Sequence, residues 1–293
     1  MKRLAVLGLG LLGSEIAIRL RAQGFDVIGW NRTPGRGDAL AVTGVRIAAS
    51  PAEAIGGAEA TLLLLSDALA IEETLAAAGV ADALPGRVLI QMGTIAPDES
   101  RRLAEQVAAA GGAYLEAPVL GSLPEARAGR LIVMAGGDSD LYPRCLPILE
   151  ALSESPQRIG SVGQGAALKL AMNQLIAGLT ATFSLSLGLV RAEGIDVDQF
   201  MALLRGSALY APTFDKKLAK YLAHDYGTAN FPLKHLRKDI NLFREVAIRS
   251  GLDEAPLAVL ADACDRAIDA GLGDSDYSAV YEALVQPQPR GSS

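Results

Sequence analysis

The chain has 293 residues, of which 50% are hydrophobic and 20% charged, and its formal net charge is −6. That length suits two domains, and that apolar content excludes general disorder, although we expect disorder in the tail after Pro287. Because the charge balance is acidic, there is no broad positive field to attract nucleic acid or an anionic membrane surface.

The first half of the chain alternates between short apolar runs and amphipathic segments. Repetition of strand, helix and strand predicts an α/β domain built on a parallel, doubly wound sheet. The expected strands are Arg3–Leu7, Asp26–Trp30, Ala60–Leu65, Arg87–Met92, Ala113–Glu116 and Leu131–Ala135, and expected helices include Leu11–Gln23 and Asp98–Ala110.

The rhythm changes near Gly163, after which no strand is expected. A long helix should run from Ala166 to Ala192, apolar on nearly all sides. Its Asn173, Gln174 and Thr180 would be penalised in hydrocarbon, so we expect a buried interdomain helix and no membrane span. The pattern predicts an α/β domain over 1–162 and an all-α domain over 163–293. Later helices are expected at Asp196–Arg205, Leu233–Ser250, Pro256–Ala270 and Tyr277–Leu284, with stops at Gly194, Gly251 and Gly271.

A glycine-rich turn, Gly8-Leu9-Gly10-Leu11-Leu12-Gly13, joins the first expected strand to the first expected helix. A GxGxxG motif alone is weak evidence, but this strand–helix context is the one that dinucleotide binding requires. Gly8 permits a tight turn, Gly10 lets backbone amides approach a pyrophosphate, and Gly13 lets the helix pack closely on the sheet. The helix N-terminus then faces the diphosphate charge.

The residues after the second strand indicate which cofactor is bound. NAD-selective sites usually place Asp or Glu there, whereas this chain has Asn31-Arg32-Thr33. Arg32 offers a fork of donors for a 2′-phosphate, and Asn31 and Thr33 can add hydrogen bonds, so we expect NADPH (NADP+). Leu65-Ser66-Asp67 and Met92-Gly93-Thr94 follow later strands and should reach the same crevice, where Thr94 would face the nicotinamide.

Lysine usage points to the reacting end of the site. After Lys2 no lysine occurs before Lys169, near the start of the most apolar helix. A partly buried lysine can give up its proton, and Asn173 lies four residues on, on the same helix face. Together they could hold one oxygen, the ammonium donating a proton and the amide fixing geometry. The two histidines, His224 and His235, follow no expected strand and are less suitable acids.

Three further segments bear on the site. The loop from Glu116 to Ser122 follows a strand and ends in small residues, whose backbone amides can bind a carboxylate. The segment from Phe231 to Asp239 begins a basic helix. Its composition alone predicts a solvated helix face. Cys145 and Cys264 are far apart and match no metal-ligand spacing, so we expect no metal site and reduced thiols in a cytoplasmic protein.

In this order, these segments resemble the β-hydroxyacid dehydrogenase family, most closely its glyoxylate/succinic semialdehyde reductases, over about residues 3–286. A further matching motif is Gly271-Leu272-Gly273-Asp274-Ser275-Asp276-Tyr277-Ser278-Ala279-Val280. The resemblance implies a Rossmann domain, an all-α domain that helps to form a homodimer or homotetramer, and a small-molecule carbonyl substrate.

The resemblance also implies roles for individual residues. It makes Lys169 the catalytic acid and Asn173 its companion. The residues that it places at the cofactor are Leu65, Ser66, Thr94 and Lys238, together with the glycine turn and Asn31-Arg32-Thr33. The residues that it places at the substrate are Leu120, Gly121, Ser122, Phe231 and Asp239.

Two departures from the family's pattern bear on the substrate. The family commonly has serine where this chain has Leu120, which removes a hydroxyl donor, and often has Ser-Thr where this chain has Gly93-Thr94. A hydrogen bond to a charged group contributes roughly 1.5–3 kcal/mol, so carboxylate binding should weaken. Reduction of succinic semialdehyde, glyoxylate or a related aldehyde or oxo acid remains the leading prediction. The alternatives are an imine reductase-like enzyme, a 3-hydroxyacid dehydrogenase working oxidatively, and an NADPH-binding regulatory protein without turnover.

Overall fold

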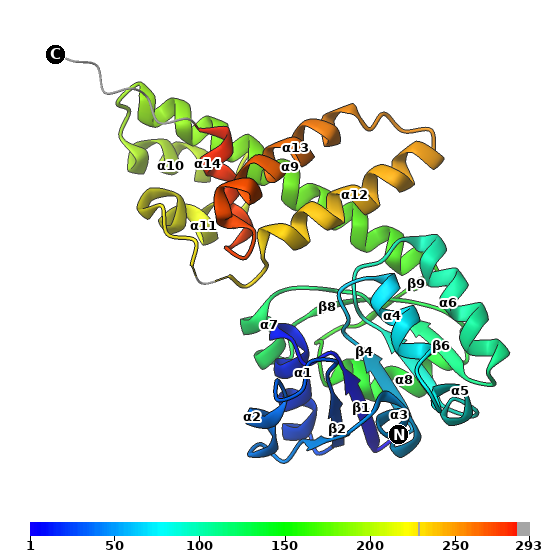
Figure 1. Cartoon of the computed structure of the whole chain (residues 1–293). Coiled ribbons are helices and arrows are strands. Elements are labelled where there is room, and N and C mark those ends of the chain that lie inside the picture. The colour runs from blue at the N-terminus through cyan, green and yellow to red at the C-terminus, as the bar shows by residue number, and fades with distance from the viewer. Residues whose placement is uncertain (228, 286–293) are drawn as a thin grey trace. The chain divides into compact units, whose positions relative to one another are not determined.

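A computed structural model describes residues 1–227 and 229–285 (Figure 1). The tail predicted to be disordered after Pro287 lies outside the described residues. The chain divides into two compact units, Met1–Ala171 and Met172–Ser293, and the division falls within one long helix. The sequence placed the boundary at the start of that helix, near residue 163.

The N-terminal unit is built on a single sheet with the strand order β3-β2-β1-β4-β5-β6-β8-β7, and β9 pairs with β8. All pairs from β3 to β6 are parallel. This is the strand order of a Rossmann fold. The chain first adds β2 and β3 on one side of β1 and then crosses back to place β4 on the other side. The strands are β1 (Arg3–Leu7), β2 (Asp26–Trp30), β3 (Arg46–Ile47), β4 (Ala60–Leu63), β5 (Val88–Gln91), β6 (Ala113–Glu116), β7 (Val119–Leu120), β8 (Ile132–Gly136) and β9 (Gln157–Gly160).

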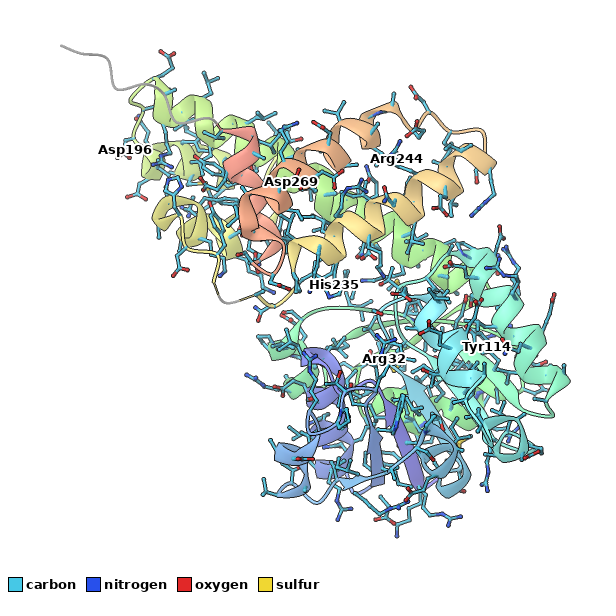
Figure 2. All side chains as sticks on the ribbon, viewed as in Figure 1. Arg32, Tyr114, Asp196, His235, Arg244 and Asp269 are labelled. Carbon is cyan, nitrogen blue, oxygen red and sulfur yellow. The ribbon has the colours of Figure 1, made fainter. Side chains whose placement is uncertain are left out.

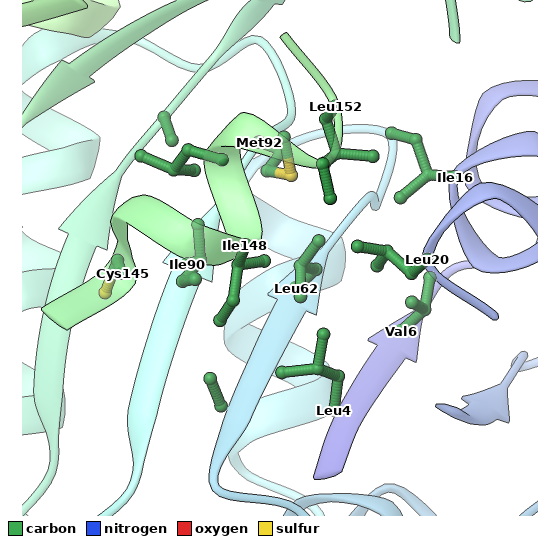
Figure 3. Packing of buried hydrophobic residues seen from close by; sticks show 14 of the residues in the cluster. Leu4, Val6, Ile16, Leu20, Leu62, Ile90, Met92, Cys145, Ile148 and Leu152 are labelled. Carbon is green, nitrogen blue, oxygen red and sulfur yellow. The ribbon is translucent and has the colours of Figure 1, made fainter. Parts of the chain in front are cut away.

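The central strands β1, β4, β5 and β6 are buried on both faces, which agrees with their largely apolar sequences. Because side chains alternate, Leu4 and Val6 face one helical layer while Ala5 and Leu7 face the other. Figure 3 shows the first layer, where Ile16, Leu20 and Ile148 meet the strands. The helices are α1 (Leu11–Ala22), α2 (Asp38–Ala41), α3 (Pro51–Gly57), α4 (Ala68–Leu75), α5 (Val80–Ala83), α6 (Pro97–Ala109), α7 (Leu123–Ala128) and α8 (Leu141–Glu150).

The far edge of the sheet differs from the all-parallel prediction. Strand β8, predicted as Leu131–Ala135, runs antiparallel to β6 and β7. The short strands β3, β7 and β9 were not predicted. They contain two to four residues each, too few for alternation or an apolar run to stand out, and only pairing with a neighbour defines them.

The C-terminal unit is helical, and no named strand follows Gly163 in the described part of the chain. Gly194, Gly251 and Gly271 have φ of +68°, +70° and +88°, which confirms the predicted stops. The helix at Pro212–Ala223 was not predicted. The elements are α9 (Gln164–Ala192), α10 (Val197–Arg205), α11 (Pro212–Ala223), α12 (Leu233–Arg249), α13 (Ala255–Ala267), η1 (Ile268–Leu272), η2 (Tyr277–Val280) and α14 (Tyr281–Leu284).

Helix α9 is the one described helix long and apolar enough to cross a membrane by length and composition, with a hydropathy of 1.5 over a window that is 39% buried. Phe183 and Leu187 on this helix belong to the core of the C-terminal unit. Thr180 and Ser184 are also buried in the protein, where the Ser184 hydroxyl donates to the Thr180 carbonyl. These contacts are those of a core helix in a folded unit.

Candidate active site

The turn between β1 and α1 has the tight packing that glycine alone permits. Gly8 has a φ of +100°, and a Cβ there would lie 2.3 Å from the Leu64 carbonyl oxygen. A Cβ on Gly13 would lie 1.9 Å from the Gly8 carbonyl oxygen. A Cβ on Gly10, by contrast, would meet no described atom within 4 Å, and no side chain caps the first turn of α1. The positive end of α1 therefore opens onto free space, as a diphosphate site requires.

These surroundings predict different outcomes for two alanine substitutions. Gly10→Ala should weaken binding of a dinucleotide at least about tenfold without changing stability, because the methyl group enters the space that a pyrophosphate needs. Gly13→Ala should weaken binding and also lower the unfolding midpoint, because the turn must shift away from α1. Titration with NADPH and urea unfolding, both followed by fluorescence of the single tryptophan Trp30, check the pair. Equal loss of stability in both variants would contradict this assignment of roles.

The end of β2 is tied to the glycine turn through Asn31. Its Oδ1 accepts from the Leu9 amide at 3.0 Å and holds the glycine turn, while its Nδ2 donates to the Thr33 carbonyl at 3.1 Å within the loop after β2. Arg32 (Figure 2) is exposed and pairs with Glu73 at 3.1 Å. Both partners are more than half exposed, so the pair stabilises the fold little and leaves the guanidinium able to change partner.

In the sheet, β4 is the neighbour of β1 on the side away from β2, and β5 is the strand after β4. Ser66 is exposed and its hydroxyl donates to Asp67, which also caps α4 through the Ala70 amide. Thr94 is half-buried in the loop before α6. A Cβ on Gly93 would lie 2.8 Å from the Leu65 carbonyl oxygen, which accounts for glycine at this position. The structure thus brings these strand ends to the switch point of the sheet, where ligands bind in open α/β folds.

The loop after β6 holds the residues expected at the substrate. Leu120 ends β7 and lies opposite Ile132 of β8. Gly121 is exposed with a φ of +130°. The Ser122 amide and hydroxyl both donate to Glu125 Oε2, at 2.7 and 2.6 Å, and form a capping box at α7. The two Ser122 donors are therefore engaged by a carboxylate of the chain itself.

A buried carboxylate at the end of β6 holds the start of α9. Glu116 Oε1 accepts from the amides of Gly163, Gly165 and Ala166 at 2.8, 2.7 and 3.3 Å. Its Oε2 accepts from the hydroxyl of Ser100 at 2.5 Å. Glu116 is 1% exposed, so its negative charge lies at the positive end of the helix dipole within the interior of the unit.

Lys169 lies in the second turn of this anchored helix and is 8% exposed. Asn173, one turn further and on the same face, is 3% exposed. The Asn173 Nδ2 donates to Asp239 Oδ2 at 2.6 Å, while its Oδ1 has no hydrogen-bond partner among the described residues. Within the C-terminal unit, α9 and α12 are thus joined by an amide–carboxylate hydrogen bond.

The other predicted residues of the C-terminal unit lie at the start of α12. Lys238 Nζ is 3.1 Å from Asp239 Oδ1. Phe231 stacks on His235 at 6.4 Å between ring centroids, and the Phe231 carbonyl accepts from the Tyr277 amide at 2.9 Å. Burial lowers the pKa of His235 (Figure 2), which keeps this ring neutral against Phe231 at neutral pH.

Sequence reasoning missed three buried or half-buried polar clusters. The sequence alone identifies Glu116 only as the first residue of a loop. The ion pair of Lys217 with Asp276, 2.7 Å long and 6% and 0% exposed, was not recognised. Glu125 could have been found, because Ser122 followed three residues later by Glu is a capping-box pattern. The bond between Glu116 and the Gly163 amide and the Lys217–Asp276 pair join residues 47 and 59 positions apart, and no local pattern reveals such pairs.

No cluster of three or more metal-ligating side chains occurs among residues 1–227 and 229–285. Both cysteines are free and buried. Burial raises the pKa of Cys145 to about 11 and that of Cys264 to about 12, so both are unreactive thiols at neutral pH.

Comparison with known proteins fits this geometry. Residues 3–163 match the NAD binding domain of 6-phosphogluconate dehydrogenase, and residues 163–284 match the NAD-binding domain of NADP-dependent 3-hydroxyisobutyrate dehydrogenase. The chain is 33% identical to glyoxylate/succinic semialdehyde reductase 1 of Arabidopsis thaliana over 280 residues, which is 95% of this chain and 96% of that relative.

Solved structures share the fold. A 3-hydroxyisobutyrate dehydrogenase of Mycobacterium tuberculosis superposes with a TM-score of 0.87 at 24% identity and covers 97% of this chain and 99% of that one. An imine reductase of Streptomyces aurantiacus superposes less well, with a TM-score of 0.63 at 26% identity, and covers 96% and 99% of the two chains.

A Rossmann sheet with an open glycine turn, together with these matches, defines an enzyme: an NAD(P)-dependent oxidoreductase that acts on hydroxyl or aldehyde groups. Its family follows from the relatives that match nearly the whole chain. The chain belongs to the β-hydroxyacid dehydrogenase family.

Proposed function

We propose that this enzyme uses NADPH to reduce a small carbonyl compound, a short aldehyde or oxo acid, with Lys169 as the proton donor. Bound NADPH supplies the hydride for the carbonyl carbon. The name of the reductase relative supports this substrate class, because it includes glyoxylate and succinic semialdehyde.

The observation that carries the proposal is the burial of Lys169 on an anchored helix. Lys169 is 8% exposed, and an ammonium held in the interior can donate a proton to a substrate oxygen that becomes negative. Because Glu116 fixes the first turn of α9, Lys169 projects from a rigid element.

Asn173 supports this role from the next turn. Its amide carries two N–H groups, and Asp239 accepts from Nδ2. We propose that the bond to Asp239 fixes the amide plane and that the second N–H holds the substrate oxygen beside Lys169. The proposed substrate contacts also include the loop from Leu120 to Ser122 and Phe231, while Thr94 and Lys238 contact the cofactor, as the family resemblance implies.

The direct test is NADPH consumption by the purified protein with succinic semialdehyde, glyoxylate, uncharged short aldehydes and a cyclic imine. Saturable turnover of a carbonyl compound supports the proposal. Turnover of the imine alone would instead make the chain an imine reductase that shares the fold.

We further propose that NADPH is preferred over NADH because of Arg32. Arg32→Ala should lower kcat/KM for NADPH about 10- to 100-fold and change that for NADH little, since only NADPH carries the 2′-phosphate that a guanidinium can bind bidentately. Steady-state rates with both cofactors measure the ratio. The control is Glu73→Gln, which removes the present partner of Arg32 and keeps the guanidinium. An unchanged cofactor ratio in Arg32→Ala would refute the preference.

We propose that the enzyme acts in the cytoplasm as a homodimer or homotetramer. The longest helix supports self-association, because Leu175, Leu185 and Leu189 on α9 are 59%, 54% and 63% exposed. Large apolar side chains repeated along one helix face are typical of a surface that another subunit covers. The two buried, unpaired cysteines are consistent with a reducing compartment.

A further inference from the structure

The substrate loop after β6 contains a carboxylate of its own. Glu125 Oε2 receives both the amide and the hydroxyl of Ser122, at 2.7 and 2.6 Å. These are two of the donors that a substrate carboxylate would need in this loop. A second carboxylate could reach them only by displacing Glu125, and it would then lie beside another negative charge.

The residue before Ser122 cannot easily rearrange to compensate. Gly121 has a φ of +130°, and a Cβ there would lie 2.8 Å from Leu131 Cδ2 and 3.1 Å from Glu125 Cβ. Gly121 therefore lies close to the Glu125 stem and to the buried Leu131 side chain, where a larger residue would not fit. The capping box holds the neighbouring Ser122 in place.

The exposed face beside the loop is apolar. Leu120 of β7 and Ile132 of β8 are directly opposite in the antiparallel pair, so their side chains share one face of the ribbon. Leu120 is half-buried, and Ile132 is 52% exposed. Side chains of this kind favour contact with a hydrocarbon group and cannot stabilise a charge.

We infer that this loop selects a carbonyl substrate with an uncharged, apolar end, and that Leu120 and Glu125 exclude substrates that end in a carboxylate. The inference rests on the proposed function, because it takes the loop from Leu120 to Ser122 as a wall of the substrate site. It narrows the substrate class to neutral aldehydes such as short alkanals.

Butanal and succinic semialdehyde test this inference, because the two aldehydes have four carbons each and differ at the end away from the reacting carbonyl. The wild-type enzyme should show a kcat/KM for butanal at least about tenfold above that for succinic semialdehyde, as expected when one hydrogen bond to a charged group is missing. The double variant Leu120→Ser with Glu125→Ala restores a hydroxyl and releases the Ser122 donors. It should shift this ratio toward succinic semialdehyde by about tenfold or more.

Single variants at Glu125 separate the effect of its charge from the effect of its hydrogen bonds to Ser122. Glu125→Gln removes the charge but still accepts from Ser122, so it should shift the ratio less than Glu125→Ala does. The matched control is Glu15→Ala, which removes another carboxylate bound to the same helix, through its 2.6 Å pair with Arg127, and leaves Ser122 untouched. It should leave the ratio unchanged.

The outcomes are distinct. A wild-type preference for succinic semialdehyde, with no gain from Glu125→Ala, overturns the inference and leaves the proposed reductase standing. A preference for butanal that the double variant reverses supports it. Absence of turnover with both aldehydes in the wild-type enzyme overturns the proposed function itself.

Discussion

Replacing Lys169 with alanine should lower kcat by about 10²- to 10⁴-fold and leave the Kd for NADPH nearly unchanged. The side chain is 8% exposed on α9 and the proposal gives it the only proton transfer in the reaction. Turnover is measured from NADPH consumption. Binding is measured from Trp30, the single tryptophan of the chain, which ends β2 beside the predicted adenosine side of the cofactor site.

The control for this substitution is Lys169→Arg. A guanidinium keeps the positive charge but does not release its proton at accessible pH, so it should recover binding of the substrate without recovering turnover. If both variants turn over at the wild-type rate, Lys169 is not the acid. If Lys169→Arg is fully active and Lys169→Ala is not, the role of Lys169 is electrostatic, and the proton comes from another group.

The central part of the fold could be predicted from the sequence because its signals are local. Strands β1, β2, β4, β5 and β6 are apolar runs separated by helices, and both faces of the sheet need burial. Antiparallel pairing of β8 leaves no such trace, since its direction depends on how the connection from β7 through α7 returns to the sheet. Helix α11 was missed because polar and apolar residues are mixed along it: three lysines and an aspartate lie among its twelve residues.

The candidate site was predicted unevenly for a similar reason. Gly8, Gly10 and Gly13 were assigned from spacing, and the structure shows that a Cβ on Gly8 or Gly13 would collide with a carbonyl oxygen whereas one on Gly10 would not. What the sequence did not reveal is how polar groups pair across long stretches of chain. Glu125 engages the Ser122 donors of the substrate loop, and Glu116 accepts from three amides at the start of α9, which fixes the helix that carries Lys169.

Replacing Glu116 with alanine should lower the free energy of unfolding of the N-terminal unit by about 3–5 kcal/mol. The substitution leaves the amides of Gly163, Gly165 and Ala166 and the hydroxyl of Ser100 buried without their acceptor. It also removes the charge that opposes the helix dipole of α9. Urea unfolding followed by Trp30 fluorescence reports this unit selectively, because the tryptophan belongs to β2.

Two further variants show whether the capping hydrogen bonds cause the loss. Glu116→Gln keeps a carbonyl oxygen for the three amides but loses the charge, so its loss of stability should be about half or less. Glu105→Ala removes an exposed glutamate from α6 and should change stability by less than about 0.5 kcal/mol. An unfolding midpoint for Glu116→Ala equal to that of Glu105→Ala would show that the start of α9 holds without this carboxylate. In that case the position of Lys169 must be set by the packing of α9 alone, since no other described side chain accepts from the three amides at its start.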